Sequence, residues 1–316
     1  MKNHFKKLLL MALMAVMAVG LIACGTDKSD NESTKEEKTS VTITSLDASK
    51  NEIELEVPYN PKRIAILDLA SLDIIDELGV GDRVVGMAST SIDYLEKYSN
   101  DASIKNLGTI KEADLEAVME CEPDIIFIGG RLSKSYDALS EIAPVVYLAT
   151  DTNEGLVNSV SKNAKTIASI FGMEDKVDSL MSDFGARIDT IKKISSGKTA
   201  LVGMTTSGSF NLLGNDGRCS LIGVEAGFNN LTAAGSTSTH GNESSFETVV
   251  QQNPDYIFVM DRDSAISTAG AKTAKEIVEN ELVKTTDAYK NNHIIYLEHS
   301  NVWYTAEGGI QALDIM

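Results

Sequence analysis

Short apolar runs alternate with amphipathic stretches along most of this chain, and the alternation predicts its secondary structure. Apolar runs bounded by polar residues are typical of β-strands, and apolar residues spaced three and four apart are typical of helices. The predicted strands are residues 63–67, 84–87, 125–128, 145–148, 200–204, 256–260 and 294–297, after a hairpin over 41–57. The predicted helices are residues 71–78, 114–121, 135–142, 160–171, 220–226, 246–251 and 274–284. Strands and helices in this order favour an α/β fold with mainly parallel sheets.

One part of this pattern occurs twice. Residues 114–131 read DLEAVMECEPDIIFIGGR, and residues 245–262 read SFETVVQQNPDYIFVMDR. The shared Glu, Val, Pro-Asp, Ile-Phe and Arg positions all keep one offset of 131 residues. Agreement at a fixed offset indicates two copies of one structural unit. The chain is therefore predicted to form two similar Rossmann-like lobes.

The segment between the lobes predicts a single long helix. Its apolar residues recur at spacings of 3, 1, 3, 4 and 3 from Val177 to Ile191, with Asp and Lys on the other face. A helix of about 22 residues is roughly 33 Å long, enough to run from one lobe to the other. The predicted boundaries are a first lobe over 41–172, the helix over 173–196 and a second lobe over 197–316.

The N-terminal region predicts export rather than folded structure. A start containing Lys2, Lys6 and Lys7 precedes an apolar run over residues 8–20, which is short for a permanent membrane anchor. Residues 1–23 are therefore predicted to be a signal peptide. The run ends in Leu-Ile-Ala-Cys, which resembles a bacterial lipobox with Cys24 as the lipidated residue. Residues 24–40 lack packing side chains and are predicted to be a disordered tether.

Charge and cysteine content narrow the possible partners. The formal net charge is −18, which argues against nucleic acid because phosphate binding needs a basic face. Only Cys121 and Cys219 remain after Cys24. They are not equivalent in the repeat, so two buried thiols are predicted in preference to a disulfide.

Arginines mark the expected binding cleft. Ligands of α/β sheets lie beyond the carboxyl ends of the strands, and Arg131 and Arg262 follow equivalent strands of the two copies. Arg218, in a Gly-rich turn before a helix, is a third candidate. Clustered guanidiniums favour an anionic, oxygen-rich ligand. The alternative is that each arginine is an isolated surface charge.

His240 and Tyr304 are candidates to complete an iron(III) site. His240 lies in a polar loop, and Tyr304 follows the last strand next to the single tryptophan, Trp303. An anionic phenolate suits a hard trivalent ion. The alternative for His240 is an ordinary surface residue. His293 and His299 flank a strand and are interpreted as structural.

The combined motifs resemble a known family. The lipobox, the linking helix, GGRLSKSYDALSEIAP, THGNES, NPDYIFVMDR and VWYTAEGG are similar to segments of the siderophore-binding lipoproteins of bacterial ABC iron importers, in particular those taking ferric catecholates of the petrobactin kind. The resemblance covers residues 41–316 and implies two α/β lobes joined by one long helix (the class III periplasmic-binding-protein fold). It implies no intrinsic cofactor and no enzymatic activity. The expected protein is a monomer anchored at the outer face of the cell membrane.

The resemblance also implies roles for individual residues. Arg131, Arg218 and Arg262 match arginines around the catecholate oxygens. Trp303 is placed at the ligand site by its adjacency to Tyr304, not by the resemblance. His240 and Tyr304 match the residues that ligate iron when the siderophore leaves two positions open. Glu116 and Glu247 match the acidic residues that dock on the permease, which works with its ATPase. The alternative for these glutamates is a pair of solvated residues at helix N-termini.

Other functions remain as alternatives. Haem or cobalamin capture on the same fold would not need His240 and Tyr304 together with three arginines. Direct zinc or manganese capture lacks a dedicated set of histidine ligands. A surface hydrolase would use His240 as base with Ser244 or Ser245, but no Gly-x-Ser-x-Gly motif precedes a helix here.

Overall fold

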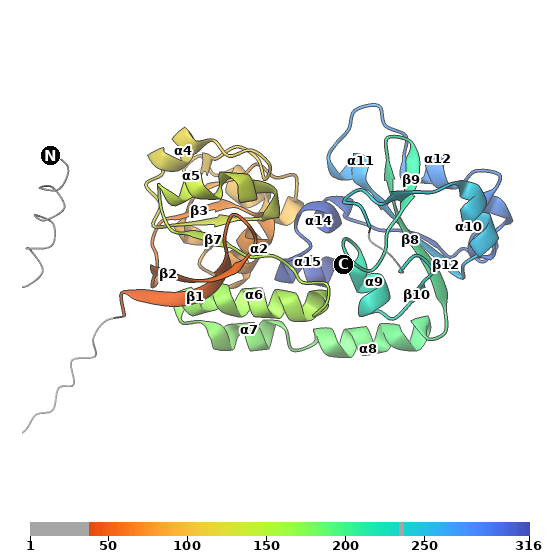
Figure 1. Cartoon of the computed structure of the whole chain (residues 1–316), viewed down its shortest axis with the longest axis horizontal. Helices are drawn as coiled ribbons and strands as arrows, with labels where there is room; N and C mark the ends of the chain where they lie inside the picture. The colour runs from red at the N-terminus through yellow and green to blue at the C-terminus, as the bar shows by residue number, and fades with distance from the viewer. Residues whose placement is uncertain (1–37, 234–236) are drawn as a thin grey trace, which may run out of the picture. The chain divides into compact units, whose positions relative to one another are not determined.

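The computed structural model describes residues 38–233 and 237–316, which form two α/β lobes (Figure 1). The predicted signal peptide, the lipidation site Cys24 and most of the predicted tether lie outside these residues. None of the helices within the described ranges is both long enough and apolar enough to cross a membrane.

The first lobe is built on a parallel five-stranded sheet. Its strands are β3 (Ile64–Leu67), β4 (Val84–Met87), β5 (Lys105–Asn106), β6 (Ile125–Ile128) and β7 (Val145–Tyr147), in the order β5-β4-β3-β6-β7. Its helices are α2 (Leu69–Glu77), α3 (Glu96–Ser99), α4 (Leu115–Glu120), α5 (Tyr136–Ser140) and α6 (Leu156–Phe171), with 3-10 turns η1 (Gly81–Arg83), η2 (Asp93–Leu95) and η3 (Gly130–Ser135). The predicted hairpin consists of β1 (Ser40–Leu46) and β2 (Glu52–Pro58), paired antiparallel.

Strand β3 shows why this sheet needs helices on both faces. Successive strand residues point to opposite sides of a sheet. Ile64 and Ile66 pack into the core that contains α6, and Ala65 and Leu67 pack into a separate core that contains residues of α4. All four are fully buried, so the strand reads as a continuous apolar run, as expected for a parallel sheet covered on both faces.

The second lobe has a mixed six-stranded sheet. Its strands are β8 (Thr199–Thr206), β9 (Ser209–Leu212), β10 (Asn229–Asn230), β11 (Asn242–Glu243), β12 (Tyr256–Asp261) and β13 (Ile294–Tyr296), in the order β11-β9-β8-β12-β13 with β10 beside β8. Its helices are α9 (Ser220–Val224), α10 (Phe246–Gln252), α11 (Arg262–Ala265), α12 (Ala274–Val278), α13 (Asp287–Lys290), α14 (Ser300–Thr305) and α15 (Ile310–Ile315), with the 3-10 turn η4 (Val283–Thr285). Strand β9 is antiparallel to β8 and to β11.

The sequence repeat corresponds to a structural repeat. Helix α4 leads to β6 as α10 leads to β12, and each strand pairs in parallel with the central strand of its lobe. The shared Asp has the same role in both copies. Asp124 accepts hydrogen bonds from the backbone N–H of Arg63 (2.9 Å) at the start of β3, and Asp255 accepts one from Thr199 (2.8 Å) at the start of β8. The prediction of two copies is confirmed.

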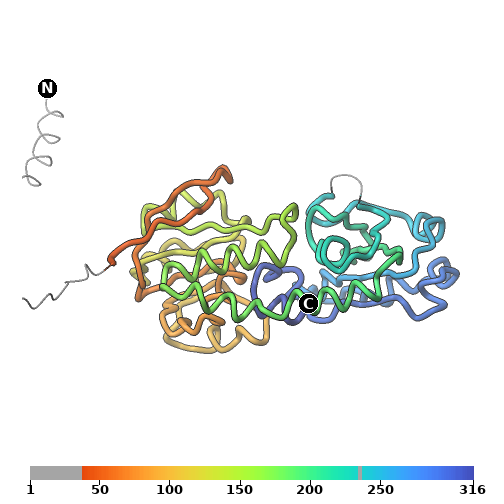
Figure 2. Tube along the Cα trace, turned by 90° about the horizontal axis from the view of Figure 1, so that it is seen from below, coloured from red at the N-terminus to blue at the C-terminus, as the bar shows by residue number. Residues whose placement is uncertain are grey.

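The segment between the lobes is not one continuous helix, which corrects the prediction. It consists of α7 (Glu174–Leu180) and α8 (Phe184–Ser195), separated by a turn at residues 181–183 (Figures 1 and 2). The Ser182 hydroxyl donates to the Ser179 carbonyl at 2.9 Å and competes there with backbone hydrogen bonding. Val177 and Phe184 are both buried, and seven residues are close to two helical turns, so the periodicity continues through the break.

The predicted helix over 274–284 is also interrupted. Helix α12 ends at Val278, and a separate 3-10 turn, η4, follows at Val283–Thr285. Thr273 and Glu276 form a capping box at the start of α12. The break follows because the Asn280 side chain accepts hydrogen bonds from the backbone N–H groups of Leu282 (3.0 Å) and Val283 (3.1 Å), which starts a new turn.

Two helices are capped at their N-termini by carboxylates from distant parts of the sequence. Helices α6 and α15 follow glycines, Gly155 and Gly309, which have no side chain to cap them. Glu225, which follows α9, accepts a hydrogen bond from the N–H of Val157 (3.1 Å) in α6. Asp73 of α2 caps α15 in turn, so α15, predicted within the second lobe, packs against α2 of the first. These carboxylates complement the partial positive charge of helix N-termini and tie the lobes together.

Candidate ligand-binding site

Three arginines from different parts of the chain surround the ring of Tyr304. The guanidinium carbons of Arg131, Arg218 and Arg262 lie 5.6, 4.4 and 5.6 Å from the ring centroid. Arg131 follows β6 of the first lobe, Arg218 precedes α9, and Arg262 begins α11 after β12. The structure therefore brings together the three arginines that the sequence singled out. We call these arginines and Tyr304 the arginine cluster.

Hydrogen bonds fix the cluster to Tyr304 from both lobes. Arg131 Nη2 donates to the backbone carbonyl of Tyr304 at 2.9 Å, and Arg262 Nε donates to the Tyr304 hydroxyl at 3.1 Å. The Arg262 guanidinium also contacts Thr206 Oγ1 (3.2 Å) and Asp263 Oδ1 (3.4 Å). Asp263 is thus the nearby counter-ion of Arg262, and Arg131 keeps donors for an incoming ligand.

The phenol of Tyr304 is shifted toward ionisation. Its side chain is buried, and burial alone would raise the pKa of the phenol. The hydrogen bond from Arg262 and the positive charges of Arg218, Arg262 and Lys111 outweigh burial and lower the pKa below its ordinary value. A phenol that loses its proton more readily is a better oxygen ligand for iron(III).

His240 lies in an exposed turn beside the same positive charges. Its backbone carbonyl accepts a hydrogen bond from Asn211 Nδ2 at 2.9 Å. The adjacent Gly241 has φ of +75°, and a Cβ there would come within 2.8 Å of the Asn211 side chain. Partial burial, followed by the charges of Arg262 and Arg218, lowers the pKa of His240. The shift favours the neutral imidazole, which is the form that ligates metals.

A cavity of about 350 Å³ opens at the cluster, between the two lobes. Arg131, Arg218 and Tyr304 line it together with two carboxylates, Asp68 and Glu307. Burial raises the pKa of Asp68, which caps α2 by accepting from Ser71, and raises the pKa of Glu307 to about 7. The cavity therefore combines a cationic wall with carboxyl groups that are only weakly acidic.

Trp303 is not part of this cavity. Its side chain is buried and lines a separate apolar cavity of about 250 Å³, together with Phe184 of α8 and Phe228 and Phe258 of the second lobe. Adjacent residues of a helix point about 100° apart, so Tyr304 faces the cluster while Trp303 faces the linking segment. The expected place of Trp303 at the ligand site stays a prediction.

Sequence reasoning missed Lys111 and Glu307. Lys111 is an exposed residue of the first lobe, between β5 and α4, and its charge lowers the pKa of both His240 and Tyr304. The repeat gave no signal for Lys111, because it aligns with Asn242 of β11, a residue of different chemistry. Glu307 had no signal either: it lies in the turn after α14, outside both copies.

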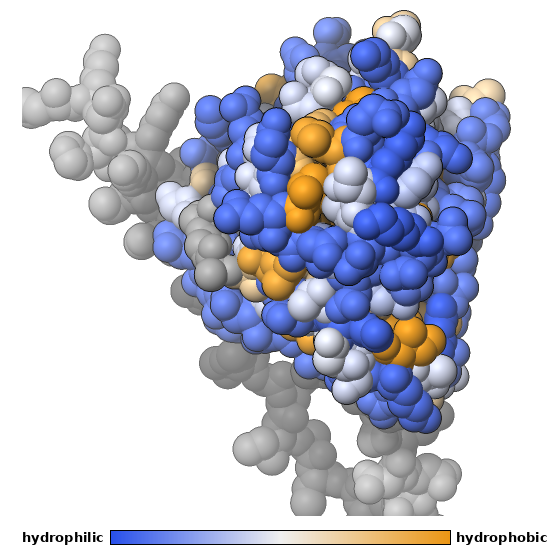
Figure 3. Space-filling model, turned by 90° about the vertical axis from the view of Figure 1, so that its right-hand side faces the viewer, coloured by the Kyte–Doolittle hydropathy of each residue, from blue (hydrophilic) through white to orange (hydrophobic). Residues whose placement is uncertain are grey.

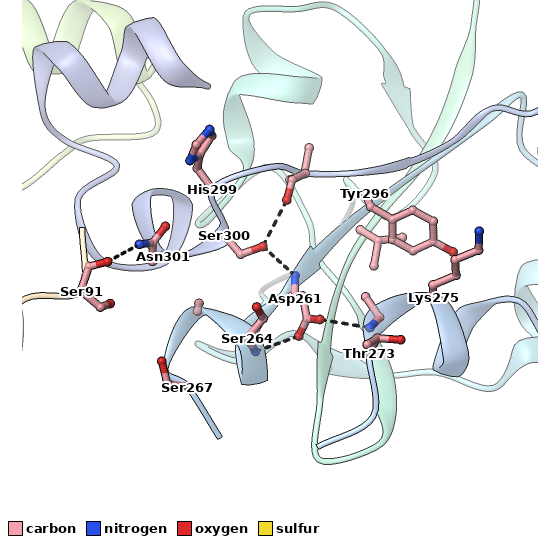
Figure 4. A pocket seen from close by; sticks show the side chains of 14 residues that line it. Ser91, Asp261, Ser264, Ser267, Thr273, Lys275, Tyr296, His299, Ser300 and Asn301 are labelled. Atoms are coloured by element: carbon pink, nitrogen blue, oxygen red, sulfur yellow. Dashed lines mark hydrogen bonds between the residues drawn. The ribbon is translucent and has the colours of Figure 1, made fainter. Parts of the chain in front are cut away.

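A second cavity, of about 530 Å³, lies at the carboxyl ends of β12 and β13 (Figure 4). Asp261 in its wall is already engaged, because it accepts hydrogen bonds from the N–H groups of Ser264 (3.0 Å) and Ala274 (3.0 Å). Asn301 donates to the Ser91 carbonyl of the first lobe at 2.7 Å. His299 lines this cavity and not that of the arginine cluster.

The two predicted docking glutamates lie at the surface of the protein. Glu116 and Glu247 are exposed in the first turns of α4 and α10. The face of the second lobe turned to the viewer in Figure 3 is mainly hydrophilic.

Two further predictions concern the cysteines and one of the histidines. Cys121 and Cys219 are buried free thiols, as predicted. His293 stacks on Tyr256 with centroids 4.3 Å apart, which fits a structural role.

Two α/β lobes with mainly parallel sheets, a helical segment running between them and a ligand-sized cavity where they meet define a substrate-binding protein. The chain belongs to the periplasmic binding protein family, whose sequence model matches residues 64–300. The two-lobed α/β fold predicted from the sequence is thereby confirmed.

Particular relatives are siderophore-binding proteins by name. The petrobactin-binding protein YclQ of Bacillus subtilis (strain 168) is 36% identical over 321 residues, covering 98% of this chain and 96% of the relative. Its crystal structure matches with a TM-score of 0.80, covering 87% of this chain and 95% of that chain. The catecholate-siderophore binding protein VctP of Vibrio cholerae matches with a TM-score of 0.78 at 31% identity, covering 87% and 98%. These similarities confirm the family resemblance inferred from the motifs.

A relative of lower sequence identity is also named as a binding protein for a ferric complex. The ferric-anguibactin-binding protein FatB of Vibrio anguillarum (strain ATCC 68554 / 775) is 26% identical over 266 residues, covering 82% of this chain and 81% of the relative. The names of all three relatives refer to binding, and none refers to catalysis.

Proposed function

We propose that this protein is the extracellular substrate-binding component of an ABC importer and that it captures a ferric catecholate siderophore between its lobes. The names of YclQ and VctP support this class of ligand. The iron is cargo, not a resident cofactor, so the chain needs to bind and release the complex and performs no chemical step.

The observation that carries the proposal is the arginine cluster. Three guanidiniums around one phenol create a site for an anion rich in oxygen, because guanidinium keeps its charge when water is removed. Catecholate complexes of iron(III) are anionic and present deprotonated oxygens at their surface. Charge-assisted hydrogen bonds from Arg131 and Arg218 are matched to such acceptors.

His240 and Tyr304 extend the proposal to direct iron ligation. A tetradentate bis-catecholate leaves two coordination positions open, and a neutral imidazole with a readily ionised phenol would occupy them. The lowered pKa values of both side chains support this role. A hexadentate ligand needs neither residue, so the two ligand classes provide a test of ligation.

Delivery involves the outer faces of the lobes. We assign the docking contacts to Glu116 and Glu247, which occupy equivalent positions in the two copies and are exposed. The partner is a permease with basic pockets, driven by its ATPase, and the binding protein acts as a monomer. Lipidation of Cys24 would hold it at the outer face of the membrane.

Direct binding measurements test the proposed function. Wild-type protein is dialysed to equilibrium against ferric bis-catecholate, ferric tris-catecholate and a ferric hydroxamate of similar size, and iron is quantified in both chambers. We expect saturable stoichiometric binding of the catecholates at about micromolar concentration and much weaker binding of the hydroxamate. Equal binding of all three complexes, or binding of none, contradicts the proposal. A double variant, Arg131→Gln with Arg218→Gln, is expected to lose catecholate binding while remaining folded.

A further inference from the structure

The Glu307 carboxylate is connected to both proposed iron ligands through Arg218. Glu307 Oε1 accepts a hydrogen bond from the backbone N–H of Cys219 at 3.0 Å, next to Arg218 in the chain. The Arg218 guanidinium lies over the Tyr304 ring and donates from Nη1 to the Thr239 carbonyl at 3.0 Å. Thr239 precedes His240, so one arginine spans the two sides of the proposed iron site.

The backbone of Cys219, next to Arg218, has an unfavourable conformation that the hydrogen bond to Glu307 can stabilise. Cys219 has φ of +60°, in the left-handed region that non-glycine residues seldom adopt, and it forms the N-cap of α9 without a side-chain cap of its own. The hydrogen bond from its N–H to Glu307 stabilises this conformation. A different backbone angle at Cys219 would direct Arg218 away from Tyr304.

We propose that Glu307 is a positioning residue, which sets the separation of His240 and Tyr304 by fixing Arg218. The inference rests on the proposed function, because the separation matters only if these two residues complete the iron shell. The hydrogen-bond acceptor, and not the negative charge, carries this role. Consistent with that, burial raises the pKa of Glu307 to about 7, so both its charged and its neutral forms are present at neutral pH.

Other charged groups lie near Glu307, and the variants used in the test leave them unchanged. Arg218 and Arg131 favour its ionised form, and Glu225 opposes it. Glu307→Gln keeps an oxygen that accepts from Cys219 but removes the charge. Glu307→Ala removes the acceptor as well. The pair separates hydrogen bonding from electrostatics.

The experiment measures dissociation constants of the wild type and both variants for ferric bis-catecholate and ferric tris-catecholate. We expect Glu307→Ala to weaken the tetradentate complex about tenfold more than the hexadentate one, and Glu307→Gln to leave their ratio within about twofold of the wild type. The visible circular dichroism of the bound bis-catecholate complex should lose intensity in Glu307→Ala only. Glu307→Asp, whose shorter side chain does not reach Cys219, replaces the alanine variant if that variant fails to fold.

The results that would reject the positioning role of Glu307 differ from those that would reject the proposed function. Equal weakening of both complexes by Glu307→Ala, or equal damage by the alanine and glutamine variants, overturns the positioning role. Failure of the wild type to bind either complex rejects the proposed function and this inference with it. Normal binding by the wild type with an unchanged ratio in Glu307→Ala rejects the inference alone.

Discussion

Asp73 and Ala312 are 239 residues apart in the chain and are joined by a buried hydrogen bond, from the Ala312 N–H to Asp73 Oδ2 at 2.9 Å. The same carboxylate accepts from the N–H of Gln311 (2.9 Å) and from the hydroxyl of Tyr94 (2.7 Å). Asp73 is completely buried, so these donors replace its water. The end of the described chain is thereby attached to the first lobe.

Replacing Asp73 with alanine should strongly destabilise the protein. The change leaves two helix N–H groups and the Tyr94 hydroxyl without their acceptor, at a cost of about 2–4 kcal/mol. Urea unfolding followed by circular dichroism measures the loss. Asp137→Ala, at an exposed position in α5, is the matched control and should change stability by less than about 0.5 kcal/mol. Equal stability of the two variants would contradict the capping role.

The stability of the protein should depend on pH through Asp73. Burial raises the pKa of this carboxyl to about 6, so the folded chain holds the proton more tightly than the unfolded chain does. Its contribution to the free energy of unfolding is fully present below the ordinary aspartate pKa and is lost as the pH rises through about 6. Asp73→Asn removes this titration. Between about pH 4 and pH 7, the variant should lose about 1–3 kcal/mol less stability than the wild type; parallel curves would exclude the effect.

Removing the proposed iron ligands should discriminate between ligand classes. Tyr304→Phe keeps a ring for the arginines but removes the oxygen, and His240→Ala removes the imidazole. The double variant should bind a tetradentate ferric bis-catecholate at least about tenfold more weakly, and a hexadentate tris-catecholate within about threefold of the wild type. Equilibrium dialysis with iron quantification measures both constants. Equal losses for the two ligands would rule out direct ligation.

The phenol of Tyr304 should titrate at higher pH when Arg262 is replaced. Arg262→Met removes the hydrogen bond and charge that lower the pKa, while the burial that raises it remains. Ultraviolet absorbance of tyrosinate during alkaline titration, with the curve of Tyr304→Phe subtracted, isolates this phenol. Arg187→Met is the control, because Arg187 pairs with Asp314 outside the cluster, and it should leave the titration unchanged. An unshifted titration in Arg262→Met would show that Arg262 does not set this pKa.

Reversing the charge of the docking glutamates should separate transport from binding. Cells that depend on this protein for ferric catecholate should take up iron at least about tenfold more slowly with Glu116→Arg and Glu247→Arg combined, because like charges would then face the basic permease. The purified variant should bind the complex as tightly as the wild type. Glu52→Arg and Glu54→Arg combined, at exposed positions of β2, match the change in net charge and serve as the control. Normal uptake by the double variant would refute the docking assignment.

The fold was largely predictable because its signals are local. Buried parallel strands such as β6 read as continuous apolar runs, and the repeat placed Arg131 and Arg262 at equivalent strand ends. The linking helix was predicted as continuous because the apolar period passes through the break between Leu180 and Phe184. The two-residue strands β10 and β11 are too short and polar to show a period.

The candidate site was predictable only in part, for a different physical reason. Positions fixed by a repeated unit, such as that of Arg131 at the end of β6, could be inferred from the sequence. Lys111 and Glu307 act across the cleft through contacts that no local pattern records. Trp303 was assigned to the ligand by its adjacency to Tyr304, and the direction of successive side chains in α14 separates the two.

Tyr304 is held at its carbonyl by Arg131 of the first lobe and at its hydroxyl by Arg262 of the second. Each arginine lies one strand and one helix away from the glutamate of its own copy, Glu116 or Glu247. A rotation of one lobe against the other that separates the arginines must also move the glutamates. The spacing of these two exposed carboxylates therefore changes with the width of the cleft, so the docking surface proposed above would report to a membrane partner whether the cleft is filled.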